Sequence, residues 1–331
     1  MQNISAKNLA IGSLILSLIA YAFVPILIKW SEVEISPEAT IFNRYWIAAL
    51  ILVCWQFLRI ILHFNSSQFV NEPNIELESV QDVFISQPIS LEVEPTENSK
   101  RLYLTWAIAI LAYAIAPVSW AWSLTETTVA NSALIHNLTP LFTTVGSWLV
   151  FKTQFKRQFW LGTILAVGGA IFLGFNDFQL DFQRINGDFL ALISAMFFAI
   201  GLMSTERLQA QTSTIKMVFW LSWAGAAILL FITLALGKPL FPVSFPGWLA
   251  VVMLAIVGQL LAVGFVTYSL SQLSASLVAL VFLLDPVLTA IAAWFAFEES
   301  LNFLNGICFV IILFGVYLGL TAKQELNQHS H

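Results

Sequence analysis

The side chains best suited to chemistry lie inside long apolar runs of this sequence. Four polar residues follow one another at spacings of 4, 3 and 4, which places them on one face of a helix: Ser132, His136, Thr139 and Thr143. Asn137 lies beside this stripe. Hydroxyl, imidazole and amide groups both donate and accept hydrogen bonds. The stripe therefore predicts a polar binding surface for a small molecule, on a helix that must turn it away from lipid.

A single acid, Asp285, falls in the middle of a later apolar run. An ionised Asp in mid-membrane costs about 2.5–3.5 kcal/mol on insertion scales. The facing runs offer no obvious Lys or Arg partner, so the carboxyl should hold a proton unless a cation replaces it. One interpretation is that Asp285 exchanges its proton with a cationic group of a cargo molecule, or couples proton entry to export. The other is a neutral Asp bonded to a backbone carbonyl.

The surroundings of this acid repeat an earlier stretch at a fixed offset of 146 residues. The two stretches are Ser132-Ala-Leu-Ile-His-Asn-Leu-Thr-Pro140 and Val278-Ala-Leu-Val-Phe-Leu-Leu-Asp-Pro286. Pro140 and Pro286 lack an amide donor, which frees the carbonyls of His136 and Phe282 one turn earlier. Such groups are tolerated only where they face protein or a wet cavity. Two related halves with proline-interrupted helices point to a transporter, whereas the alternative is that the prolines only kink helices for packing.

Composition and charge predict an all-α integral membrane protein. Apolar residues make up 59% of the chain and charged residues 10%, far from the roughly quarter charged of a soluble domain. Ten apolar runs approach the roughly 20 residues that a membrane helix needs. They cover about 9–28, 41–62, 103–123, 128–150, 159–175, 187–207, 216–236, 247–270, 276–297 and 301–321.

Ten transmembrane helices divide into two five-helix repeats, 1–175 and 176–323, followed by a flexible tail, 324–331. An odd number of spans per repeat requires the second repeat to be inverted. With the N- and C-termini in the cytoplasm, ten Lys and Arg residues fall inside and four outside, as the positive-inside rule demands. The first run is full length and lacks a small-residue cleavage site, so we expect a retained helix in the plasma (inner) membrane.

One segment, 63–101, does not fit the bundle. It carries seven acids against two bases, and loops of this length are either functional or disordered. We expect a disordered, dispensable cytoplasmic insert; the alternative is a docking site for a soluble partner.

Further polar and aromatic residues are candidates for the same cavity. They are Ser17 and Tyr21 in the first run, Tyr113 in the third, Gln259 in the eighth and Thr289, which matches Thr143 in the repeat. By contrast, we expect Arg44 to reach the headgroups, Trp120 to lie in an interfacial belt and Glu126 to cap the fourth helix. Glycines of the fifth run, Gly162, Gly168, Gly169 and Gly174, should allow close helix packing.

Several function classes lack a pattern in this sequence. There is no glycine-rich phosphate loop, no zinc-like His cluster and no paired thiols, since Cys54 and Cys308 lie in opposite halves. We therefore predict neither an enzyme nor a cofactor nor a metal site. The sequence also lacks a basic patch of the kind that binds nucleic acid. The expected partners are a small-molecule substrate, the lipid bilayer and, as a candidate coupling ion, the proton.

The combination of features resembles the EamA-type branch of the drug/metabolite transporter superfamily. The resemblance rests on the two proline helices, on the Asn43-Arg44 start of the second helix, on Glu298-Glu299 and on Gly306 and Gly315 in the last run. It covers nearly everything except 63–101. Where the family usually has a Glu after the first proline helix, this chain has Lys152-Thr153.

The resemblance implies transport of small metabolites, often outward, through a central cavity formed by both repeats. Tyr, Trp, His, Asn and one Asp in that cavity suit amino-acid-like compounds or amines. A sugar-phosphate or nucleotide-sugar carrier is the alternative, which we disfavour because Arg44 is shallow. A membrane enzyme or a non-transporting scaffold is the remaining alternative.

Overall fold

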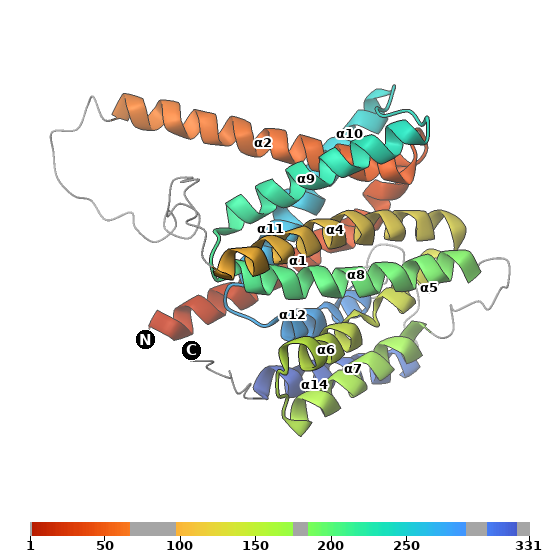
Figure 1. Ribbon diagram of the computed structural model, residues 1–331. Coiled ribbons are helices and arrows are strands. Elements are labelled where there is room, and N and C mark those ends of the chain that lie inside the picture. Colours follow the sequence, from red (N-terminus) through yellow and green to blue (C-terminus); the bar gives the residue numbers. More distant parts are fainter. Residues whose placement is uncertain (1, 67–96, 175–184, 289–302, 323–331) are drawn as a thin grey trace.

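Every regular element in the described part of the chain is a helix. The computed structural model describes residues 2–66, 97–174, 185–288 and 303–322 (Figure 1). The elements are α1 (Gln2–Ser31), α2 (Pro37–Ser66), α4 (Glu97–Glu126), α5 (Val129–His136), α6 (Thr139–Phe151), α7 (Arg157–Gly174), α8 (Ile185–Gln209), α9 (Thr214–Ala235), α10 (Phe245–Met253), the π-helix η2 (Leu254–Val263), α11 (Gly264–Ser269), α12 (Ala275–Phe282) and α14 (Phe303–Thr321).

Seven of the described helices are long and apolar enough to cross a bilayer. They correspond to α1, α2, α4, α8, α9, the continuous stretch α10–η2–α11 and α14. The expected runs at 128–150, 159–175 and 276–297 coincide with shorter helices: α5 with α6, α7, and α12. The chain is therefore a multi-pass membrane protein, and ten complete spans remain a prediction.

The exterior of the bundle is apolar, as lipid contact requires. On α1, Leu16 and Phe23 are about half exposed, whereas Leu14 and Leu18 on the other side of the helix are buried. The other long helices show the same arrangement. Contiguous apolar surface of this extent marks an interface with another phase, here the hydrocarbon of the membrane.

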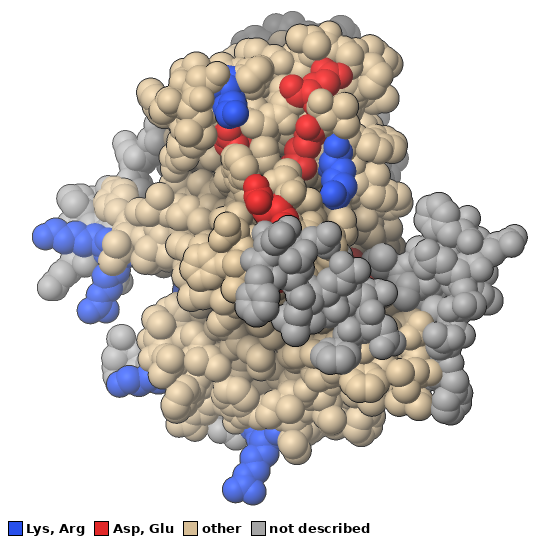
Figure 2. All heavy atoms as spheres, turned by 90° about the vertical axis from the view of Figure 1, so that its right-hand side faces the viewer, with Lys and Arg blue, Asp and Glu red and all other residues tan. Residues whose placement is uncertain are grey.

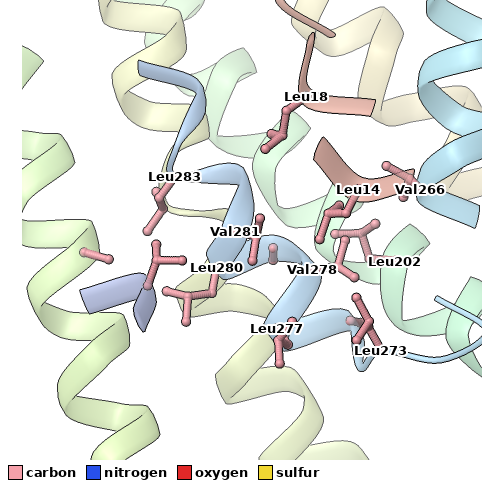
Figure 3. Close-up of a cluster of buried hydrophobic side chains, with 14 of the residues drawn as sticks. Leu14, Leu18, Leu202, Val266, Leu273, Leu277, Val278, Leu280, Val281 and Leu283 are labelled. Atoms are coloured by element: carbon pink, nitrogen blue, oxygen red, sulfur yellow. The ribbon is translucent and has the colours of Figure 1, made fainter. Parts of the chain in front are cut away.

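Helices from the first and second halves of the chain lie side by side. α4 runs along α8, α2 along α9, α7 along α14, and α1 packs against η2 and α11 (Figure 1). The largest apolar cluster surrounds α12: Val278 lies towards Leu14 of α1 and Leu202 of α8, and Leu280 lies on the opposite side of α12 (Figure 3). This cluster fixes the position of the segment that leads into Asp285.

Glycine allows α7 and α14 to approach closely. A methyl group added at Gly162 would lie 2.5 Å from the carbonyl oxygen of Gly315, and one added at Gly169 would lie 2.9 Å from Ile312. The predicted close approach is thus confirmed for these two residues. It is wrong for Gly168, which has nothing within 4 Å of an added methyl group.

Both proline helices are interrupted rather than kinked. α5 ends at His136 and α6 begins at Thr139; α12 ends at Phe282 and helical backbone returns from Asp285 to Leu288. The two interruptions, 137–138 and 283–284, are separated by the same offset of 146 residues as the sequence repeat. A prolyl ring tolerates the first turn of a helix but not its interior, so Pro140 opens α6 instead of bending a continuous helix.

The expected insert at 63–101 is helical at both of its ends. α2 continues to Ser66 and α4 begins at Glu97, so both ends of the expected insert are helical. Its centre, 67–96, lies outside the described residues, as does the expected tail 324–331.

Candidate functional site

A cavity of about 280 Å³ lies between α1, α2, α4, α5 and α8, beside the interruption that follows α12. Its aromatic wall consists of Tyr21, Tyr45, Tyr113, Trp120, Phe197, Phe198 and Phe282. Its polar groups are Arg44, His136, Asn137, Ser194 and Asp285. An apolar pocket with a few convergent polar groups is the usual form of a small-molecule site.

His136 lies at the end of α5 between two aromatic rings. Its ring is stacked on Trp120 at a centroid distance of 5.4 Å and an interplanar angle of 18°, and the Phe198 ring lies 5.3 Å away. Its Nδ1 is 3.5 Å from the Ser194 hydroxyl, which donates to the carbonyl of Ala116. Trp120 therefore lines the cavity instead of an interfacial belt, and its buried Nε1 has no partner among the described residues.

Asp285 opens the helical turn that follows the interruption. Its Oδ1 is buried and has no hydrogen-bond partner in the described part of the chain. The carboxyl borders the cavity together with Phe282, the repeat equivalent of His136. A buried carboxyl without a partner is costly, so a ligand or a proton that satisfies it would be favoured.

The Arg44 side chain points into the bundle, so the expectation that it reaches the headgroups is wrong. It is only 3% exposed and borders the cavity. Its Nε donates to Oε1 of Gln259 at 3.1 Å, and its Nη2 donates to the carbonyl of Gly258 at 2.8 Å. Both acceptors belong to η2. Sequence spacing placed Arg44 near a helix end but could not show that η2 would face it.

Two predicted tyrosines contribute to the walls. Tyr21 makes edge contacts with the rings of Phe282 at 5.3 Å and Phe198 at 6.4 Å, and its hydroxyl interacts with Arg44. Tyr113 borders the cavity, and its backbone carbonyl accepts the hydroxyl of Tyr45. These contacts join α1, α2, α4 and α8 around one space.

Other predicted site residues do not border the cavity. The Ser17 hydroxyl is buried and donates to the carbonyl of Ala262 at 2.9 Å. Gln259 is buried behind Arg44, and its Nε2 donates to the Ser222 hydroxyl at 3.0 Å. The Thr139 hydroxyl donates to the carbonyl of His136 at 2.7 Å, which satisfies the acceptor freed by Pro140. Thr289 lies outside the described residues.

The prolines themselves do not border the cavity either; Pro140 and Pro286 lie in the first turn of the helical segment that follows each interruption. The polar stripe of the sequence divides accordingly. Only His136 and the adjacent Asn137 face the cavity, whereas Ser132 pairs with the Ser123 hydroxyl at 2.5 Å.

Acidic side chains gather on the face of the bundle where α4 ends and α8 begins (Figure 2). In the connection between α1 and α2, the Glu34 carboxylate accepts hydrogen bonds from the hydroxyl and backbone N–H of Ser244 and from the backbone N–H of Val243, and these bonds lower the pKa of Glu34. Glu126 ends α4 and is not the cap of α5; Thr128 caps α5 by accepting the N–H of Asn131. Among the described residues, no three His, Cys, Asp or Glu side chains are placed to hold a metal ion.

The helical bundle and its apolar exterior together define a multi-pass membrane protein, and its interior holds an aromatic-walled cavity with a few polar groups. The model of the EamA-like transporter family matches residues 8–175 and 185–321. The chain therefore belongs to this family, as the sequence resemblance predicted.

Two curated relatives carry the name of a transporter. An uncharacterized transporter of Methanothermobacter thermautotrophicus is 26% identical over 63% of this chain and 62% of its own length. The uncharacterized transporter YdfC of Bacillus subtilis is 22% identical over 60% of this chain and 64% of its own length. The chain thus matches less than two thirds of either relative. One solved crystal structure, 16% identical, aligns with 97% of this chain and 99% of that chain at a TM-score of 0.68, which shows a shared fold.

Proposed function

We propose that this protein is a secondary transporter that carries small amino-acid-like or amine compounds through the central cavity. The observation that carries the proposal is the buried Oδ1 of Asp285, which has no hydrogen-bond partner among the described residues and lies beside an aromatic-walled cavity inside a membrane bundle. Aromatic rings and a carboxyl suit an amphiphile with a cationic group, since both the ring faces and the carboxyl attract cations.

Inverted repeats are the second part of the proposal. They are supported by the matching interruptions after His136 and Phe282 and by a family match that falls into two stretches, 8–175 and 185–321. Pairings between the halves, such as α4 with α8 and α1 with η2, also fit this arrangement. Rocking of one repeat against the other would expose the cavity to each side of the membrane in turn. We propose cytoplasmic termini, a plasma-membrane location and export as the direction.

Proton coupling through Asp285 is the third part. A carboxyl that holds a proton without cargo, releases it to water on one side of the membrane and then binds an ammonium group as a carboxylate would exchange proton and cargo across the membrane. Purified protein in liposomes should accumulate labelled amines when a pH gradient is imposed. Asp285→Asn should lower this gradient-driven flux at least about tenfold, because loss of a hydrogen bond to a charged group costs about 1.5–3 kcal/mol.

Glu126→Gln, at the exposed end of α4, is the matched control and should keep the wild-type flux. Unchanged flux and unchanged pH dependence in Asp285→Asn would refute the coupling. Absence of flux and counterflow for all amines and amino acids in wild-type protein would refute the proposed substrate class.

A carrier of phosphorylated sugars remains the second candidate, because Arg44 borders the cavity after all. A ligand-induced melting shift with a sugar phosphate, and none with an amine, would favour it. The cavity volume of about 280 Å³ lies at the lower end of ligand pockets, which begin at about 300 Å³, and this favours a smaller ligand.

A further inference from the structure

Arg44 has the surroundings of a built anion-binding group. The guanidinium belongs to α2, in the wall of the cavity, and is almost completely buried. A buried cation without a compensating anion is expensive. The structure gives it two neutral acceptors, Gln259 and the carbonyl of Gly258, and no carboxylate partner among the described residues.

The acceptors are themselves fixed. Gln259 can turn its oxygen to Arg44 because its amide nitrogen is engaged by the Ser222 hydroxyl of α9. Gly258 brings its backbone close to Arg44: a methyl group added there would lie 3.4 Å from Cζ of the arginine. Both residues lie in η2, and π-helical turns are rare and frequently found at functional sites.

Two hydrogen bonds to η2, one of them supported by Ser222 of α9 through Gln259, thus hold the guanidinium of α2 in one orientation. The recorded bonds engage Nε and Nη2, which leaves Nη1 and the remaining N–H groups of the planar fork for Tyr21 and the cavity. A guanidinium presents its donors in a geometry that suits carboxylates. A neutral or purely cationic ligand would leave the positive charge unmatched.

We infer that Arg44 is the specificity-determining residue that binds the carboxylate of the transported compound, so that the cavity selects zwitterions with an apolar or aromatic body over simple amines. The inference rests on the proposed function and refines its substrate class. Arg44 would bind the carboxylate, the aromatic wall the body and Asp285 the ammonium group. Gln259 acts as a positioning residue, since it contacts Arg44 and does not border the cavity.

The test compares three probes that differ by one charged group: phenylalanine, phenylalaninamide and 3-phenylpropionate. Binding to the purified full-length protein is measured by calorimetry, and transport by counterflow in liposomes. Wild-type protein should bind phenylalanine about tenfold to hundredfold more tightly than phenylalaninamide, the range expected for a charged hydrogen bond. Arg44→Gln should remove this preference and leave the binding of phenylalaninamide within a factor of two or so.

Two variants keep the test independent of folding. Arg44→Lys retains the positive charge but not the planar fork of donors, and it should weaken the binding of phenylalanine more than the binding of phenylalaninamide. Arg59→Gln removes a cation from the same helix outside the cavity and should bind all three probes as wild-type does. If Arg44→Gln does not fold, the comparison of probes on wild-type protein decides alone.

Equal binding of phenylalanine and phenylalaninamide to wild-type protein, with amine flux intact, would overturn the role of Arg44 and leave the transporter proposal standing. No binding or flux with any of the three probes would count against both. Preferential binding of 3-phenylpropionate would show that the site binds anions, and it would overturn the proposed selectivity for zwitterions.

Discussion

Arg44 and Asp285 border the same cavity but differ in their hydrogen-bond partners. The arginine has acceptors on both recorded donor groups, whereas Oδ1 of the aspartate has no partner among the described residues. A satisfied buried group contributes to one fixed geometry, and an unsatisfied one raises the energy of the empty state. This contrast fits the proposed roles, in which Arg44 binds a carboxylate in a fixed geometry and Asp285 exchanges a proton or a cation.

Glu32, in the connection between α1 and α2, provides a test at the same scale. Burial raises the pKa of Glu32 to about 7 from its usual 4.5; Lys29 opposes this shift and Glu38 adds to it. Between these two pH values the folded protein binds a proton that the unfolded chain has released, so Glu32 makes stability fall as pH rises through this window.

Glu32→Gln should therefore raise the melting temperature at pH 8 by a few degrees, and the gain should disappear towards pH 5. Thermal unfolding in detergent at both pH values measures this, with Glu126→Gln as the exposed control. An equal effect of Glu32→Gln at both pH values would contradict the assigned pKa.

The interruption between α5 and α6 yields a prediction at the scale of the element. Thr139→Val keeps the shape of the side chain but removes the donor to the His136 carbonyl, which Pro140 cannot replace. An unsatisfied buried acceptor costs about 1–3 kcal/mol. Thr125→Val removes a comparable bond, to the Trp122 carbonyl, at an exposed position and should have little effect. Urea titration in detergent compares the two variants, and equal losses would contradict the role of Thr139.

The α7–α14 pair contains its own controls. Gly162→Ala and Gly315→Ala would place a methyl group 2.5 and 2.6 Å from backbone atoms of the opposite helix. We expect a loss of about 1–3 kcal/mol, since two backbones have to separate. Gly168→Ala and Gly306→Ala, on the same two helices, meet nothing within 4 Å and should stabilise by about 0.5–1 kcal/mol. Loss of stability in all four variants would show that the backbone contact is not the cause.

At the scale of the whole molecule, the proposed topology places the end of α4 outside the cell and the end of α8 inside. In a background with Cys54 and Cys308 replaced, a cysteine at the exposed Thr125 should react with a membrane-impermeant maleimide in intact cells. A cysteine at the exposed Gln211 should react only after lysis. Equal labelling of both in intact cells would exclude the proposed orientation.

The sequence predicted the helical class, the family and the location of both helix interruptions, because apolar runs and prolines act locally. It also singled out His136, Asn137, Asp285, Tyr21 and Tyr113, which the structure places around one cavity. It missed Arg44 and Trp120, and it misplaced Gln259. Those positions depend on which helix of the second half faces the first, and a spacing pattern within one helix carries no such information.

The pairing of helices across the two halves has a consequence for synthesis in the cell. α1 packs against η2, α2 against α9, α4 against α8 and α7 against α14. Most helices of the first half therefore gain their main packing partners only after the second half has been synthesised. Until translation passes residue 259, the Arg44 guanidinium lacks both of its acceptors. The newly synthesised first half must therefore be held by the insertion machinery until the second half follows. A nonsense mutation after α7 should yield a product that quality-control proteases degrade.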